Sequence, residues 1–179
     1  MGRSARLPER GRTMRFDAAI DYPADTGRVA QMLADPDFVR RKIEASGAAS
    51  TAVEVTSADD GGFTVLTRRA MPTDKIPNAL RSFVGASIDV RFVEVWQPAD
   101  PDGRRTGTFT MDVAGAPAGA TGTTALEPDG EAGARIGYDG DAKVNVPFLG
   151  ASVERAVVEA VQNVLDAERR AGVQWLTER

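Results

Sequence analysis

The stretch PFLGASVERAVVEAVQNVLDAERRAGVQWLTER, residues 147–179, decides the fold. Small and apolar residues recur in it at steps of three or four: Val153, Val157, Ala160, Val164, Ala167, Ala171 and Trp175. At ~100° per residue, this spacing places them on one stripe of an α-helix. We therefore predict an amphipathic helix of roughly eight turns, ~45 Å long. Because such a helix needs an apolar surface to lie on, the preceding chain must supply one.

The chain before this helix is predicted to be mostly strand and turn. Asp25 and the pair Asp35-Pro36 are typical helix starts and predict two short helices after the first strand. Residues 71–84 are ambiguous, because prolines interrupt an apolar segment. The segments with strand-like alternation are residues 15–22, 51–57, 63–69, 87–97, 106–113, 121–127 and 134–146. This order predicts an α+β fold, in which a curved antiparallel sheet of about six to seven strands packs on the C-terminal helix.

Composition is that of an ordinary globular domain. The chain has 179 residues, of which 42% are hydrophobic and 27% charged, so it is long enough to bury a core. No apolar run approaches the length of a membrane span, and nothing resembles a signal peptide. We expect a cytoplasmic protein with no stable membrane insertion, and its oligomeric state stays open.

The absence of two residue types narrows the chemistry. The chain has no cysteine and no histidine, which removes thiol nucleophiles, the commonest general base and most zinc sites. We expect no metal and no cofactor. Any acid–base chemistry has to come from carboxylates, from Tyr22 or Tyr138, or from the lysines Lys42, Lys75 and Lys143.

Charge is distributed unevenly. Residues 1–13 carry a net charge of +3. Because the whole chain carries −4, the remaining residues carry −7. An acidic body argues against nucleic acid as a partner. The polar basic segment lacks periodicity, and we interpret residues 1–13 as a disordered leader before a single domain at 14–179.

Several short motifs resemble a known superfamily. Asp35-Pro36-x-Phe38 opens the second short helix, Trp96 ends a strand, and Val146-Pro147-Phe148-Leu149-Gly150 precedes Val153-Glu154. With the order of elements, these motifs resemble an uncharacterised bacterial branch of the helix-grip (SRPBCC) superfamily of START lipid-transfer domains, polyketide cyclases and the major birch-pollen allergen. The resemblance covers about residues 14–178. It implies an apolar cavity between sheet and helix that takes lipids, sterols, hormones or polyketides, and it supplies no catalytic motif.

Candidate ligand-binding residues follow from the faces of the strands and helices. Glu94 shares a strand face with Phe92 and Trp96. It is either a polar anchor or general acid in the cavity, or it is turned outward by a bulge or lies near the mouth in water. The predicted set is Phe38, Arg68, Phe83, Phe92, Glu94, Trp96, Phe109, Met111, Tyr138, Phe148, Val157 and Val161.

Two further side chains have open interpretations. Arg68 and Arg69 are adjacent, so a regular strand turns one inward, where it could pair with Glu94 or hold an acidic ligand. Alternatively, both lie at a solvated strand end. Tyr138 offers a hydroxyl either to a ligand or to a partner within the core.

Three functions are consistent with these features. The first is a non-enzymatic binding or carrier protein for a small hydrophobic or amphipathic ligand. The second is an enzyme of the cyclase or aromatase type that uses Glu94 or Tyr138. The third is an interaction domain with a filled core and no ligand. The first is favoured, since the chain lacks histidine as a base.

Overall fold

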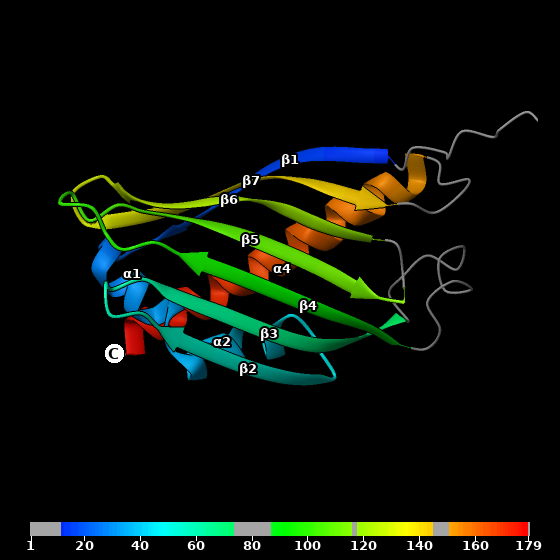
Figure 1. Ribbon diagram of the computed structural model, residues 1–179, viewed down its shortest axis with the longest axis horizontal. Helices are drawn as coiled ribbons and strands as arrows, with labels where there is room; N and C mark the ends of the chain where they lie inside the picture. Colours follow the sequence, from blue (N-terminus) through cyan, green and yellow to red (C-terminus); the bar gives the residue numbers. More distant parts are fainter. Residues whose placement is uncertain (1–11, 74–86, 116–117, 145–150, 179) are drawn as a thin grey trace, which may run out of the picture.

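The computed structural model describes residues 12–73, 87–115, 118–144 and 151–178. Within these residues, seven strands form one antiparallel sheet and three helices pack against it (Figure 1). The elements in chain order are β1 (Arg12–Tyr22), α1 (Thr26–Leu33), α2 (Pro36–Ala45), β2 (Ser50–Ser57), β3 (Phe63–Pro72), β4 (Ser87–Trp96), β5 (Arg105–Ala114), β6 (Ala118–Asp129), β7 (Gly133–Val144) and α4 (Ala151–Glu178). The predicted fold class is confirmed, including the two short helices after the first strand.

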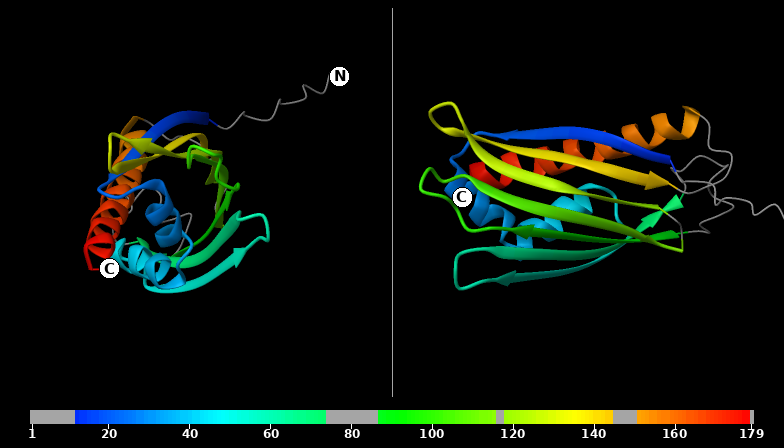
Figure 2. Two further views of the ribbon diagram at one scale, coloured as in Figure 1. Left: turned by 90° about the vertical axis from the view of Figure 1, so that its left-hand side faces the viewer. Right: turned by 45° about the horizontal axis from the view of Figure 1, so that its top comes forward.

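The sheet has the order β1-β7-β6-β5-β4-β3-β2. Strands β2 to β7 follow one another as hairpins, and β1 pairs with β7 so that Ala18 lies opposite Tyr138. The first two helices therefore connect the two outer strands of the sheet. Figure 2 shows the sheet curling into a trough, with the helices on its concave side.

Side-chain caps start both short helices as predicted. Asp25 accepts a hydrogen bond from the backbone N–H of Arg28 at 2.9 Å, which satisfies an otherwise free donor of α1. Asp35 does the same for Asp37 at 2.8 Å, and Pro36 occupies the first turn of α2. These caps fix where each helix begins, and so which of its side chains enter the core.

The predicted apolar stripe of the C-terminal helix is confirmed in the part where side chains are described. Ala167, Ala171 and Trp175 are buried, whereas Arg169 and Arg170 are exposed. The elements that α4 approaches most closely are α2, β1 and α1. Its backbone lies farther from the central strands of the sheet, so side chains must fill or line the space between them.

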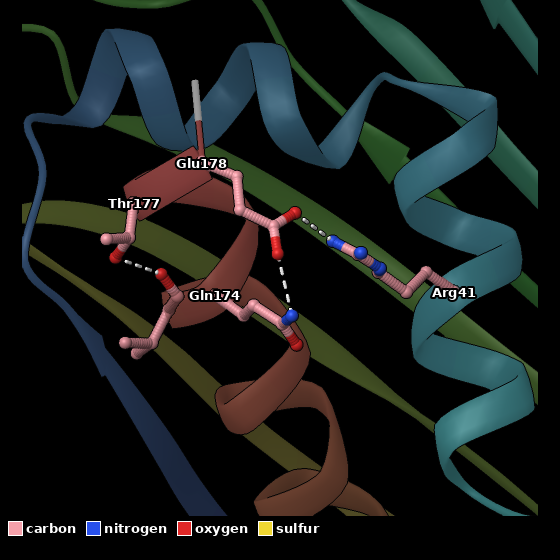
Figure 3. Close-up of polar contacts among 5 residues, drawn as sticks. Arg41, Gln174, Thr177 and Glu178 are labelled. Carbon is pink, nitrogen blue, oxygen red and sulfur yellow. Dashed lines mark hydrogen bonds and ion pairs between the residues drawn. The ribbon is translucent and has the colours of Figure 1, made fainter.

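Two contacts are made near the C-terminal end of α4. Arg41 on α2 donates to the Glu178 carboxylate at 2.8 Å, and its guanidinium lies 5.7 Å from the centre of the Trp175 ring. Gln174 donates to the same carboxylate at 2.7 Å (Figure 3). The second contact is between the backbone at Gly172 and the ring of Tyr22 on β1. A Cβ placed on Gly172 would lie 2.3 Å from Cε1 of Tyr22, so only glycine permits this approach.

The two ends of the concave face differ in burial. At the closed end, next to α1 and α2, the inward residues Ile20, Phe63, Trp96, Leu126 and Ile136 are all buried. They pack with Phe38 and the other apolar side chains of α1 and α2. At the half-buried end, the inward residues keep partial exposure; they are Ile88, Val90, Phe92, Met111 and Val113.

Some predicted boundaries shift. β1 begins at Arg12, within the segment assigned to the leader. β6 begins at Ala118, three residues earlier than predicted, because Gly119 lets its backbone lie against the Met111 carbonyl; a Cβ there would be 2.6 Å from that oxygen. Residues 145–150, assigned to the end of a strand and the start of the long helix, lie outside the described residues. Among the helices that are described, none has an apolar stretch long enough to cross a membrane.

Candidate functional site

Glu94 lies in the interior. It follows Phe92 on the concave face of β4, between Val65 on β3 and Phe109 on β5. Its side chain is 1% exposed. The prediction that Glu94 faces inward is confirmed, and the alternative of a bulge that turns it outward is wrong because the pairing of β4 is regular on both sides.

Lys42 and Glu168 meet Glu94 from two helices. The Lys42 Nζ atom on α2 lies 2.9 Å from Oε1 of Glu168 on α4 and 3.7 Å from Oε2 of Glu94. Both partners of the shorter pair are 10% exposed. One ammonium group thus joins two carboxylates that belong to different layers of the fold. Buried charges of this kind persist only when they are paired.

Tyr138 on β7 completes this group. Its hydroxyl donates a hydrogen bond to Oε1 of Glu94 at 3.3 Å, which is long for an O–H···O contact. The Tyr138 ring packs edge-on against Phe109, with ring centres 5.9 Å apart. Lys42, Glu94, Tyr138 and Glu168 are called the buried polar cluster below.

Burial and pairing set the protonation of the cluster. Burial raises the pKa of Glu94, although the Lys42 charge opposes the shift. For Lys42, burial acts to lower the pKa, but Glu168 and Glu94 outweigh it and the pKa is raised. Burial also raises the pKa of Tyr138 well above its usual value. Lys42 therefore stays an ammonium ion, which cannot serve as an amine nucleophile, while Glu94 holds a proton more readily than an exposed carboxyl group does.

Of the two adjacent arginines, Arg69 is the one that faces inward. It shares its face of β3 with the buried residues Val65 and Thr67, whereas Arg68 is exposed. The placement of Arg68 among the inward-facing residues is therefore wrong, because side chains alternate along a regular strand and Arg69 takes the inward direction. Burial lowers the pKa of Arg69, and the charges of Glu168 and Glu94 partly offset this effect.

Aromatic side chains line the concave face next to the cluster. The Phe109 ring lies 6.1 Å from Phe92 and 6.0 Å from Phe16, measured between ring centres. Its tip fits over Gly122 and Gly140, where an added Cβ would come within 2.7 Å and 2.8 Å of it. The two glycines thus let Phe109 lie flat on the sheet and leave the region above it to other groups.

The structure divides the predicted site residues into separate groups. Phe92, Glu94, Phe109, Met111 and Tyr138 share the concave face as predicted. Phe38 and Trp96 lie instead in the packed core of the closed end, where Phe38 contacts Trp175 and Trp96 stacks on Phe63. Val161 on α4 is half-buried. Phe83, Phe148 and the side chain of Val157 lie outside the described residues.

Sequence reasoning named Lys42 only among the groups available for acid–base chemistry and gave no role to Glu168. Lys42 follows Phe38 by four residues, so both occupy one face of α2. Glu168 follows Val164 by four residues and borders the apolar stripe of α4. Charged residues at these spacings next to apolar ones indicate side chains that could reach the interior. Their partners could not be identified, because the sequence does not show which helix faces lie opposite β4.

No cluster of acidic side chains suited to a metal ion occurs in the described part of the chain. The buried polar cluster contains two carboxylates, but the Lys42 ammonium lies between them and occupies the place of a cation. The group is therefore suited to hydrogen bonding and proton transfer.

Comparison with known proteins places this geometry in context. A family described as "Protein of unknown function (DUF2505)" matches residues 17–176. The uncharacterised protein Rv0481c of Mycobacterium tuberculosis is 24% identical over 168 residues, which cover 90% of this chain and 96% of that protein.

Solved structures show the same fold at low identity. A START superfamily protein from Mycobacterium smegmatis has a TM-score of 0.55 and 13% identity, over 90% of this chain and 98% of that one. The Zhui aromatase/cyclase from a Streptomyces species has a TM-score of 0.60 and 8% identity, over 94% and 96%. The resemblance to the helix-grip superfamily is confirmed at the level of fold.

Proposed function

This chain belongs to the DUF2505 family, and we propose that it binds or carries a small hydrophobic or amphipathic molecule between the concave face of the sheet and α4. The observation that carries the proposal is the partial exposure of the half-buried end. Ile88, Val90, Phe92, Met111 and Val113 point inward from two adjacent strands but are not covered as core residues are. Contiguous apolar surface left partly uncovered marks a site for another molecule.

The buried polar cluster supports the same proposal. Ligand sites of this kind combine an apolar lining with a few polar groups that fix orientation. Glu94 is the next inward-facing residue after Phe92 on β4, so the cluster lies at the boundary between the closed end and the half-buried end. A bound molecule would place its apolar part on the half-buried end and direct a polar group toward the cluster.

Fluorescence titration with the neutral probe N-phenyl-1-naphthylamine tests the proposal. We expect saturable binding to one site per chain. Val90→Trp fills the half-buried end and should weaken binding at least about tenfold, a change of about 1.4 kcal/mol. Val93→Trp adds the same bulk on the opposite face of β4 and should leave binding unchanged. No binding, or equal effects of the two substitutions, would favour an interaction domain with a filled interior.

One observation favours a catalytic variant of this function. Glu94 is buried, its pKa is raised by that burial, and Tyr138 lies 3.3 Å away. A protonated carboxyl group in such a place can donate a proton to a bound carbonyl. A cyclase-type enzyme would lose turnover of a polyketide-like ketone on Glu94→Gln while still binding it. The carrier function predicts no turnover by either protein.

A further inference from the structure

We propose that Arg69 is the anchor for an anionic head group, so that the natural ligand is an amphipathic anion such as a carboxylate with an apolar body. This inference rests on the function proposed above and names its ligand class. Three observations carry it: the direction of Arg69, its buried Nε–H group without a hydrogen-bond acceptor, and its apolar neighbours.

Arg69 points into the trough from the half-buried end. It lies opposite Val90 in the β3–β4 pairing, two residues beyond Thr67, which is 2% exposed. Its Nε atom is buried. The guanidinium is close enough to Glu94 and Glu168 for their charges to act on it. The head of Arg69 thus lies between the buried polar cluster and the apolar half-buried end.

The buried Nε–H group of Arg69 donates no hydrogen bond to the described residues. Glu94 and Glu168, whose charges act on the guanidinium, do not form an ion pair with it. The two nearby carboxylates are already engaged by Lys42, at 2.9 Å and 3.7 Å. Buried N–H donors are normally paired, so an unpaired one directed inward indicates a missing acceptor, and an anion is the strongest acceptor for an arginine.

The chemistry of the guanidinium group favours an anion. Its planar fork of N–H donors matches the two oxygens of a carboxylate. The other buried side-chain groups without hydrogen-bond partners among the described residues, which are the hydroxyls of Tyr22 and Thr124 and the Trp96 Nε1 atom, are neutral.

The apolar body of the ligand has a matching surface. Val90 lies directly across from Arg69, and Phe92 and Met111 follow on β4 and β5. All three are half-buried and point inward. A molecule with its anion at Arg69 would therefore cover these side chains with its apolar part.

Two probes that differ only by an anion test the inference. N-phenyl-1-naphthylamine is neutral, and 8-anilinonaphthalene-1-sulfonate is the same ring system with a sulfonate. The wild-type protein should bind the sulfonate at least about tenfold more tightly. Arg69→Gln should abolish this preference while leaving affinity for the neutral probe unchanged. Arg69→Lys, which keeps the charge but loses the fork, should give an intermediate preference.

The adjacent Arg68→Gln removes the same charge from the exposed face and should change neither affinity. Melting temperature serves as the folding control: Arg69→Gln should melt at or above the wild-type temperature, because it removes a buried N–H donor that has no acceptor. A clearly lower melting temperature would assign Arg69 a structural ion pair and overturn the inference.

The outcomes separate the two proposals. Binding of the neutral probe with no preference for the sulfonate, or a preference that Arg69→Gln leaves intact, overturns the anion site and leaves the carrier function standing. Failure of both probes to bind overturns the carrier function, and the anion site with it.

Discussion

The two ends of the trough are built from the same strands but are finished differently. At the closed end, α2 inserts Phe38, Val39 and Ile43 into the core that contains Trp96, and exposure falls to almost nothing. At the other end, the same strands present residues such as Phe92 and Met111 that remain half-buried. The contrast indicates that stability is concentrated at one end and that ligand binding, as proposed, uses the other.

Truncating one aromatic residue at each end gives the largest expected effect. Phe38→Ala should lower the free energy of unfolding by about 3–5 kcal/mol, because Phe38 is 0% exposed and packs on Trp175. Phe92→Ala should lower it by only about 1–2 kcal/mol, because its ring is half-buried. Urea denaturation of both variants measures the difference. Equal losses would show that the two ends are packed alike.

The boundary between the ends depends on Lys42. Lys42→Met leaves Glu94 and Glu168 without their shared cation, and we expect a loss of about 3 kcal/mol. Protonation of Glu94 limits the loss. Lys143→Met is the matched control, since Lys143 is exposed on β7 and should change stability by less than about 0.5 kcal/mol. A Lys42→Met protein as stable as the control would mean that the cluster is solvated rather than buried.

The dependence of stability on pH should show whether burial raises the pKa of Glu94. Its folded-state pKa is raised by burial, so the folded protein binds a proton that the unfolded chain lacks between the ordinary value of 4.5 and the raised one. Wild-type stability relative to Glu94→Gln should therefore increase as the pH falls through that window, and level off below it. Chemical denaturation of both proteins from neutral to acidic pH measures this difference. A decrease on acidification would show instead that the Lys42 charge dominates over burial.

The smallest effect should come from the exposed ion pair at the end of α4. Arg41 and Glu178 are 39% and 46% exposed, so solvent screens their attraction. A double-mutant cycle with Arg41→Ala and Glu178→Ala should give a coupling of about 0.5 kcal/mol. A coupling above about 2 kcal/mol would mean that this contact, and not the packed core, fixes the helix on α2.

Much of this arrangement could be predicted from the sequence where one periodicity applied to one element. The stripe of α4 and the inward direction of Glu94 follow from counting residues, and both are confirmed in the described chain. The choice between Arg68 and Arg69 was harder. Leu66 is apolar on the outer face of β3 and Phe63 is apolar on the inner one, so hydrophobicity alone did not identify the buried face.

Counting residues could not predict the buried polar cluster. Lys42, Glu94 and Glu168 come from α2, β4 and α4. Only the packing of these three elements brings both carboxylates within 4 Å of the Lys42 ammonium group. Periodicity assigns a side chain to a face, but it does not state which two faces meet. The partners of a buried charge are therefore the last thing a single sequence reveals.

The contact of Gly172 with the Tyr22 ring also limits how α4 can lie on β1. A methyl group at this position would meet the ring atoms, so the helix or the ring would have to shift. A single hydrogen atom in place of a side chain thus acts as a spacer between the two elements.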